Sequence, residues 1–326
     1  MSLLFVCSCS SIYDEKEAAI YDAELSEKSE IICKAYAKEI ELRKNNRLTL
    51  QMEREADNNF AIAHCGVKEN IKAIQDLKIK ASDGYGIPVR RYIPSNEAMK
   101  NCVLIFFHGG GFIEGNIETH DYLCRKIANS LGVQVFSVDY RLAPEHKFPA
   151  AVNDAFDVFS RLSKEYSKKN VIIAGESAGG NLCAALCIKI NREGFKKPLA
   201  QILIYPLLSG DFESKSFQAY GEGGMLLKSE MEPILKQYIG DAERSDPLIF
   251  PILQKDMSVF PETVFIAAEY DVLLDGQLAF KAKLEKERIR TRMIVSKGTI
   301  HGFTVYGEVF EEEITDSLKK TRDFFK

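Results

Sequence analysis

The 326-residue sequence lacks several features that would place it in a special class of protein. It has no long apolar run, so it predicts no transmembrane helix. Its net charge is only -4 and its pI is near 5.9, which does not favour a nucleic-acid or anionic-membrane partner. With 46% hydrophobic and 28% charged residues, the composition is typical of a soluble globular protein that can bury a large core.

Features of a disulfide scaffold, a metal site and a phosphate loop are also missing. Eight cysteines in so long a chain do not predict a disulfide scaffold. Cys183 and Cys187 are four residues apart on an expected helix, but no histidine stands at ligand spacing beside them. No glycine-rich loop for a phosphate or a dinucleotide is present. We therefore expect neither a metal nor a cofactor.

The apolar start of the chain, residues 1–7, does not have the pattern of a secretory signal. No positively charged region precedes it, and its apolar run is too short. We expect a cytoplasmic protein without a stable membrane anchor. A lipid-modified cysteine at Cys7 or Cys9 is the alternative.

The first third of the chain changes from a helical pattern to an alternating one. Residues 12–54 contain neither glycine nor proline, and their apolar positions recur at about helical spacing, which predicts one or two amphipathic helices. Residues 77–80 and 89–93 then alternate as half-buried strands do. Asp83-Gly84 is the expected hairpin turn between them.

Near-continuous apolar runs follow, and such runs predict strands of a parallel sheet that is covered on both faces. They are residues 102–107, 133–138, 171–174, 201–205, 264–268 and 293–295. Helix-like segments lie between them at residues 150–165, 182–190 and 277–287. The alternation predicts an α/β fold with a mostly parallel, doubly wound sheet and two antiparallel strands at its start. Sites in such sheets form at the carboxyl ends of the strands.

One stretch interrupts this alternation. Residues 206–253 contain no strand run, only a helix-like segment at 230–239, and they are too many for an ordinary connection. We interpret the stretch as a cap over the strand ends. The predicted organisation is N-terminal helices that contribute to the cap in 1–65, the first part of the core in 66–205, the cap insertion in 206–253, and the second part of the core in 254–326.

The run Gly175-Glu176-Ser177-Ala178-Gly179 follows an apolar strand and leads into an apolar helix. This is the G-x-S-x-G pattern in the strand–turn–helix context that it requires. Gly175 and Gly179 lack the Cβ atoms that would collide in so sharp a turn. The pattern predicts that Ser177 stands at the tip of the turn as a nucleophile. A purely structural turn is the alternative for the pattern taken alone.

A serine hydroxyl needs a base to take its proton, and the base needs a carboxylate to orient it. Only one histidine follows Ser177 in the chain, so His301 is the predicted base. Asp271 lies just past a buried strand and is the predicted carboxylate. Asp275 is expected in the first turn of the next helix, and Glu269 within the end of the strand, so both are weaker candidates.

Donors for an oxyanion are expected at a second glycine-rich turn. His108-Gly109-Gly110-Gly111 also follows a buried strand, and consecutive glycines let backbone N–H groups turn toward a ligand. We predict that the N–H groups of Gly110, Gly111 and Ala178 form the oxyanion hole. His108 is expected to anchor the loop by hydrogen bonds. A merely flexible loop is the alternative.

Other residues near these motifs have more ordinary interpretations. His120 is expected to cap or brace the helix that starts near Asp121. Some aromatic residues either line a substrate pocket or pack within the cap itself: Phe112, Phe212, Phe217 and Tyr220.

Five motifs in order, between about Leu104 and Phe303, carry a family resemblance. They are HGGGF at 108–112, DYRLAPEH at 139–146, FPAA at 148–151, GESAGG at 175–180 and HGF at 301–303. The chain resembles the hormone-sensitive-lipase-like carboxylesterases, also called bacterial family IV esterases. The resemblance implies an α/β-hydrolase core with a helical cap, a small-molecule ester substrate of short to medium chain length, and no cofactor. Members often form dimers, so a homodimer is an expected assembly.

The segment around the acid departs from the family pattern. The usual Asp-Pro-Leu-Arg-Asp stands here as Asp271-Val272-Leu273-Leu274-Asp275, which still places Asp271 at the acid. Plant hormone receptors of this fold lose the catalytic histidine, whereas His301 is kept. The sequence thus predicts a lipase-like, acetyl-hydrolase-like serine carboxylesterase that works through an acyl-serine. The alternatives are an amidase or N-deacetylase with the same triad, and a non-catalytic ligand-binding protein.

Overall fold

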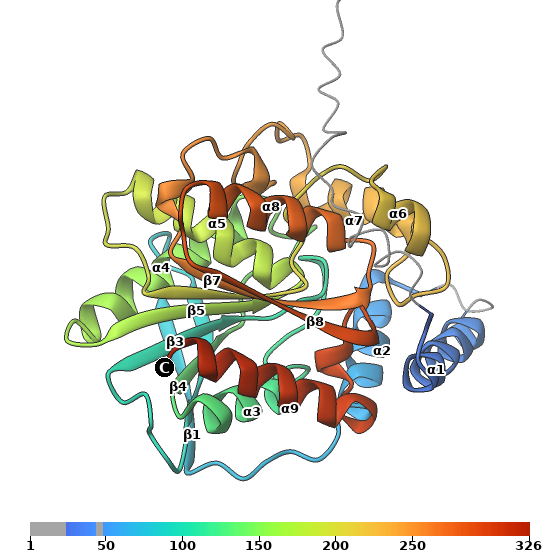
Figure 1. Cartoon of the computed structure of the whole chain (residues 1–326), viewed down its shortest axis with the longest axis horizontal. Helices are drawn as coiled ribbons and strands as arrows, with labels where there is room; N and C mark the ends of the chain where they lie inside the picture. The colour runs from blue at the N-terminus through green and yellow to red at the C-terminus, as the bar shows by residue number, and fades with distance from the viewer. Residues whose placement is uncertain (1–23, 44–47) are drawn as a thin grey trace, which may run out of the picture.

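One eight-stranded sheet organises the computed structural model, which describes residues 24–43 and 48–326 (Figure 1). Its strand order is β1-β2-β4-β3-β5-β6-β7-β8. The strands are β1 Ala73–Lys80, β2 Gly86–Ile93, β3 Cys102–Phe107, β4 Gln134–Val138, β5 Asn170–Glu176, β6 Ala200–Ile204, β7 Glu262–Tyr270 and β8 Thr291–Ile300. β1 and β2 pair antiparallel with their neighbours, and β3 to β8 run parallel. The predicted fold class is confirmed.

Helices cover both faces of the sheet, as Figure 1 shows. The core helices are α3 Asp121–Leu131, α4 Ala150–Glu165, α5 Ala178–Arg192, α8 Leu274–Lys286 and α9 Gly307–Phe324. Apolar residues of α4, α5 and α8 form one buried cluster, and those of α3 and α9 form another. Successive strand residues alternate between the clusters: Leu104 belongs to the α3 side and Ile105 to the α4 side. Burial on both faces explains why these strands are apolar at most positions.

The last helix, α9, was not predicted from the sequence. Its buried residues include Phe310, Ile314 and Leu318, each four positions from the next. This is the spacing of an amphipathic helix, so the signal was present in the sequence. α9 packs against α3 and covers the second face of the sheet.

Two regions outside the core supply further helices. The N-terminal region forms α1 Glu27–Arg43 and α2 Leu50–Ala63, and the expected insertion holds α6 Lys215–Tyr220 and α7 Lys228–Ile239. Short 3₁₀ turns are η2 Pro251–Leu253, η3 Met257–Val259 and η4 Phe303–Val305. The part of the helical prediction that falls on residues 12–23, and the alternative at Cys7 or Cys9, lie outside the described residues. The four-part division of the chain stays a prediction.

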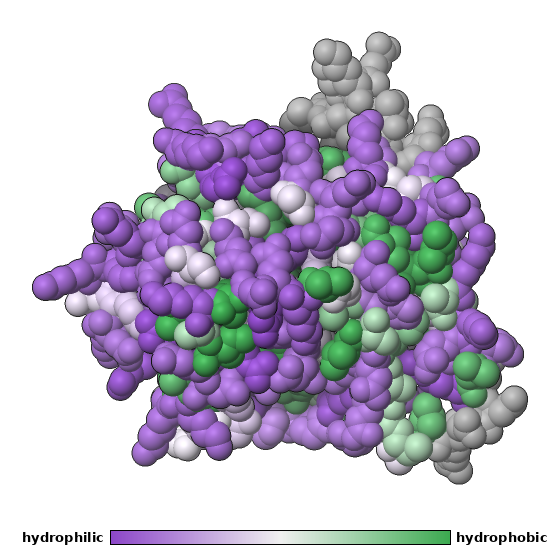
Figure 2. Space-filling view, turned by 90° about the horizontal axis from the view of Figure 1, so that it is seen from below, coloured by the Kyte–Doolittle hydropathy of each residue, from purple (hydrophilic) through white to green (hydrophobic). Residues whose placement is uncertain are grey.

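The molecular surface is largely hydrophilic on the face drawn in Figure 2, where hydrophobic residues form separate small groups. Several exposed large apolar side chains belong to α1 and α2: Ile31, Ile40, Leu42, Met52 and Ile62. None of the helices in the described ranges has both the length and the apolar character needed to cross a bilayer.

Candidate active site

Ser177 stands alone between the end of β5 and the start of α5. Its φ of 53° and ψ of -114° are unusual for a residue with a side chain. A Cβ at Gly175 would lie 2.2 Å from the carbonyl oxygen of Gly179, and a Cβ at Gly179 would lie 2.0 Å from the carbonyl oxygen of Phe107. The turn is therefore tight enough to require both glycines. It holds the Ser177 side chain at the carboxyl end of the sheet.

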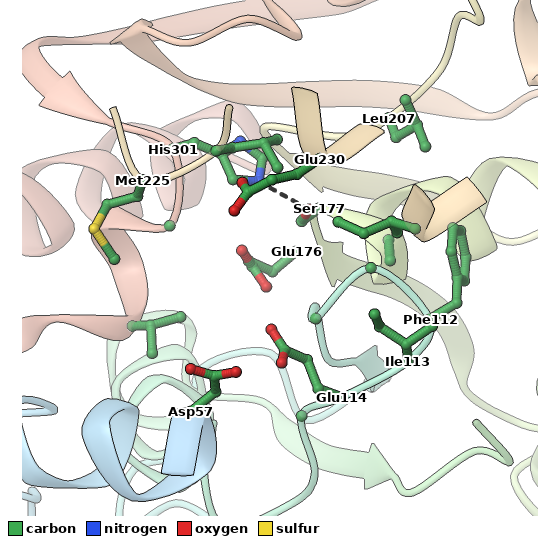
Figure 3. Close-up of a pocket in the computed structure, with 18 of the residues that line it drawn as sticks. Asp57, Phe112, Ile113, Glu114, Glu176, Ser177, Leu207, Met225, Glu230 and His301 are labelled. Carbon is green, nitrogen blue, oxygen red and sulfur yellow. Dashed lines mark hydrogen bonds between the residues drawn. The ribbon is translucent and has the colours of Figure 1, made fainter. Parts of the chain in front are cut away.

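Three side chains that are far apart in sequence meet at this end of the sheet. The Oγ of Ser177 lies 2.9 Å from Nε2 of His301, as the dashed line in Figure 3 marks. The Nδ1 of His301 lies 2.9 Å from Oδ2 of Asp271. Asp271 follows β7 and His301 follows β8, and these strands are neighbours. The structure thus brings the three predicted catalytic residues into one hydrogen-bonded chain.

The carboxylate of Asp271 is buried and already oriented. Asp271 is 1% exposed, and its Oδ1 accepts a hydrogen bond of 2.8 Å from the N–H of Leu273. Burial lowers the pKa of His301, but the charge and the hydrogen bond of Asp271, with the charge of Glu176, outweigh it and leave this pKa raised. The arrangement therefore stabilises an imidazolium ion at His301.

The rival carboxylates have other partners. The carboxylate of Asp275, in the first turn of α8, accepts a hydrogen bond of 3.0 Å from the N–H of Ser216. Glu269 lies within β7 and accepts a hydrogen bond of 2.8 Å from the N–H of Gly298. Both residues lie where the sequence predicted them.

Tyr205 supports the loop that carries His301, a role that the sequence did not suggest. Its hydroxyl is hydrogen-bonded to Oγ1 of Thr304 and accepts a bond of 3.2 Å from the N–H of Thr304. Its ring centroid lies 4.9 Å from that of His301. Because Tyr205 is fully buried, these contacts restrict the position of the imidazole.

The glycine-rich loop after β3 turns back toward Ser177. Gly110 and Gly111 have φ values of 102° and 59°, which a residue with a side chain adopts only with strain. The N–H groups of Ile113 and Glu114 donate to the carbonyl oxygen of Gly110 and close the turn. Within the described part of the chain, no hydrogen bond occupies the N–H of Gly110 or Gly111. Both glycines and Ala178 line the same cavity as Ser177.

His108 is held in a neutral state beneath this loop. Its Nδ1 donates to the carbonyl oxygen of Gly109 at 2.8 Å, and its ring stacks on Tyr140 with centroids 4.2 Å apart. Burial, aided by repulsion from His120, lowers the pKa of His108 to about 3. These contacts are those expected of a residue that anchors the loop.

His120 stands at the N-cap position of α3, where the sequence placed it, but its side chain turns elsewhere. It precedes α3, but its side chain makes no capping hydrogen bond to that helix. Its Nε2 instead lies 3.1 Å from Oε2 of Glu176 and accepts a hydrogen bond of 3.3 Å from the N–H of Gly109. His120 meets the helix through its backbone carbonyl, which accepts a hydrogen bond of 2.9 Å from the N–H of Cys124, while its side chain joins the glycine-rich loop to the residue before Ser177.

A cavity of about 440 Å³ opens in front of Ser177. Its walls come from α2, from the glycine-rich loop and from α7, with Met225 and Leu226 just before that helix (Figure 3). Phe112 is one of the lining residues. The other candidate aromatics pack in the protein core: Phe212 against Phe217 and Tyr220 against Tyr270.

The cavity has an acidic lining that the sequence did not predict. Four carboxyl residues face it: Asp57, Glu114, Glu176 and Glu230. No lysine or arginine of the described ranges is among the lining residues. Glu114 could have been singled out from the sequence, because it is a charged residue inside an otherwise apolar and glycine-rich loop. The others come from segments that only the fold brings together.

The sequence of this chain is similar to those of known proteins. A family model described as the alpha/beta hydrolase fold matches residues 104–305. An arylesterase of Saccharolobus solfataricus is 36% identical over 252 residues, covering 75% of this chain and 81% of that protein. The ethyl acetate hydrolase of Pseudomonas putida is 32% identical over 257 residues, covering 76% and 80%.

Solved structures give the same result. An ester hydrolase from the metagenome of Lake Arreo superposes with a TM-score of 0.84 at 29% identity, covering 93% of this chain and 99% of that one. A hyperthermophilic esterase from Pyrobaculum calidifontis gives a TM-score of 0.79 at 32% identity, covering 92% and 97%. The chain therefore belongs to the hormone-sensitive-lipase-like (bacterial family IV) esterases of the α/β-hydrolase fold and is a carboxylic ester hydrolase.

Proposed function

We propose that this ester hydrolase cleaves short- to medium-chain carboxylic esters through an acyl-serine intermediate on Ser177. The observation that carries the proposal is the continuous chain of two 2.9 Å contacts from Ser177 through His301 to Asp271. Nucleophile, base and orienting carboxylate need this order and these distances.

In the first half of the reaction, Oγ of Ser177 attacks the carbonyl carbon of the ester while Nε2 of His301 takes the hydroxyl proton. The carbonyl oxygen becomes an oxyanion and accepts hydrogen bonds from the N–H groups of Gly110, Gly111 and Ala178. The bond from the carbonyl carbon to the alcohol oxygen then breaks. His301 gives its proton to that oxygen, and the acyl group stays on Ser177.

In the second half, a water molecule attacks the acyl-serine and His301 takes a proton from it. The bond to Oγ breaks, the carboxylic acid is released, and the proton returns to Ser177. Asp271 holds Nδ1–H throughout, so that Nε2 is the basic nitrogen in both halves.

The size of the cavity supports the proposed chain length. About 440 Å³ is near the lower end of the range for small-molecule pockets, which is roughly 300–1,000 Å³. The 32%-identical relative from Pseudomonas putida is named an ethyl acetate hydrolase, and ethyl acetate is an ester of a short acid. These observations favour acetyl to medium-length acyl groups.

Replacement of the nucleophile tests the proposal. Ser177→Ala is expected to lower kcat for p-nitrophenyl butyrate by at least about 10⁴-fold, because the acyl-serine cannot form. A fluorophosphonate probe should label the wild type once, at Ser177, and should not label the variant. Ser167→Ala, which changes an exposed serine, serves as the matched control.

The outcome that contradicts the proposal is near-normal hydrolysis by a folded Ser177→Ala protein. Circular dichroism and the thermal midpoint establish that the variant is folded. Matched p-nitrophenyl ester and p-nitroanilide substrates separate the esterase from the amidase alternative. Faster turnover of the anilide would assign the site to amides.

A further inference from the structure

The acidic lining of the cavity is concentrated opposite the proposed nucleophile. Figure 3 shows the carboxyl groups of Asp57, Glu114 and Glu176 pointing into the space between α2 and the Ser177–His301 pair. Glu230, in the first turn of α7, is a further lining residue. Four separate parts of the chain, namely α2, the glycine-rich loop, the end of β5 and α7, thus place carboxyl groups around one small volume.

Most of these carboxyl groups have a partner within the protein. Asp57 accepts a hydrogen bond of 2.6 Å from Nη1 of Arg43, and Glu230 accepts one of 2.9 Å from the N–H of Leu227. Glu176 faces Nε2 of His120 at 3.1 Å. Asp57 and Glu230 are therefore each compensated, at least in part, by a donor.

Glu114 differs from the other three. No lysine or arginine of the described ranges forms an ion pair with it, and its carboxyl group instead interacts with that of Asp57. Burial raises the pKa of Glu114 to about 8, and the charges of Asp57 and Glu230 add to the effect. A carboxyl group that is buried beside other carboxyl groups is a group whose ionised form a bound cation would stabilise.

The other walls of the cavity suit an organic cation. Tyr36 and Tyr306 line it together with apolar side chains such as Met225 and Ile234. Aromatic faces attract ammonium groups, and apolar walls accommodate their methyl or methylene groups. No cluster of three His, Cys, Asp or Glu side chains within residues 24–43 and 48–326 has the geometry to hold a metal ion.

We propose that the substrate is an ester with a quaternary ammonium group, which Glu114 binds together with Asp57 and Glu230 while Ser177 attacks the carbonyl carbon. The inference rests on the hydrolytic function proposed above and names the substrate class of the same site. Glu114 acts here as a specificity-determining residue and takes no part in the chemical steps.

The preference for a cationic ester over the matching neutral ester is expected to depend on pH. The charged and titratable groups around Glu114 are Arg43 and Tyr36 of α1, Asp57 of α2, Glu230 of α7, Tyr306 after η4, and Glu176. Ionisation of Glu114 adds a negative charge to those of Asp57 and Glu230, so the preference for a cationic ester rises as the pH rises through about 8. Protonation of His301 affects cationic and neutral esters alike and cancels in their ratio.

Two pairs of isosteric esters test the proposal, one pair for each side of the ester bond. On the acyl side, the p-nitrophenyl ester of 4-(trimethylammonio)butyric acid is compared with that of 5,5-dimethylhexanoic acid. On the alcohol side, butyrylcholine is compared with 3,3-dimethylbutyl butyrate. In each pair a carbon atom replaces the charged nitrogen, and rates of alkaline hydrolysis without enzyme correct for intrinsic reactivity.

The expected result is a kcat/KM ratio, cationic to neutral, of about tenfold or more in at least one pair at pH 8.5. Glu114→Gln should lower this ratio about tenfold and remove its rise with pH, because the amide keeps the shape and loses the charge. Glu118→Gln, which changes an exposed carboxyl group close by in the chain, is the matched control and should keep the wild-type ratio.

Three results would overturn the inference. Hydrolysis of the neutral esters without preference for either cationic ester refutes the ammonium substrate and leaves the esterase proposal intact. A cationic-to-neutral ratio that Glu114→Gln leaves at the wild-type value refutes the role of Glu114 in binding the cation. Failure to hydrolyse any of the four esters, by protein that circular dichroism shows to be folded, refutes both proposals.

Discussion

Asp271→Asn tests the orienting carboxylate of the proposed triad by the change of a single atom. Asparagine keeps the oxygen that accepts the N–H of Leu273, and it places an amide NH₂ group opposite Nδ1 of His301, 2.9 Å away. An NH₂ group only donates, so Nδ1 must become the acceptor and the imidazole proton moves to Nε2. Nε2–H then faces Ser177 and cannot take its proton. The same exchange in the serine-protease template lowers kcat about 10⁴-fold, which corresponds to about 5 kcal/mol of barrier.

The pH profile provides a second, independent readout of this variant. In the wild type, burial lowers the pKa of His301, but Asp271 outweighs burial and raises it. Activity falls with decreasing pH through that pKa, because the imidazolium cannot accept a proton. Without the charge of Asp271 the pKa of His301 falls, so the acidic limb of kcat/KM should move to lower pH.

The assay is hydrolysis of p-nitrophenyl butyrate by wild type, Asp271→Asn and two matched controls. Asp275→Asn and Glu269→Gln change the neighbouring carboxylates that have partners other than His301, and both should keep activity within about tenfold of wild type. The reasoning is refuted when Asp271→Asn also stays within tenfold, or when Asp275→Asn shows the large loss instead.

Two further predictions concern stability. Gly179→Ala should lower the free energy of unfolding by about 1–3 kcal/mol or more, because the added Cβ would lie 2.0 Å from the carbonyl oxygen of Phe107. Gly86→Ala is the control. Its Cβ would have no contact closer than 3.7 Å, so the free energy of unfolding should change by less than about 1 kcal/mol. Equal thermal midpoints for the two variants would contradict the close approach. Asp154→Asn should cost about 3 kcal/mol in urea unfolding, because it removes the buried carboxylate that pairs with Arg141 at 2.6 Å. An unchanged urea midpoint would show that this pair is not structural.

The sheet was readable from the sequence because burial on both faces leaves a simple pattern. A strand covered on two sides is apolar at most positions, and β3 to β7 each overlap one of the predicted apolar runs. α9 was not predicted, although its apolar residues recur every four positions as those of an amphipathic helix do.

Some residues of the site could likewise be predicted from the sequence and others could not. Ser177, Asp271 and His301 follow strand ends in an order that a linear motif records, and parallel strands bring their ends to one edge. His120 and Tyr205 have no such signal. Their roles depend on contacts with Glu176 and Thr304, which lie 56 and 99 positions away in the chain.

The sequence alone determined that a serine, a base and an acid would meet at the carboxyl end of a mostly parallel sheet, because local patterning sets the strands and their chain order sets the motifs. Only the tertiary structure decided what surrounds them. The carboxyl groups of Asp57, Glu114 and Glu230 come from α2, from the loop after β3 and from α7. Their common electrostatic field depends on distances through space, which no local pattern in the chain encodes.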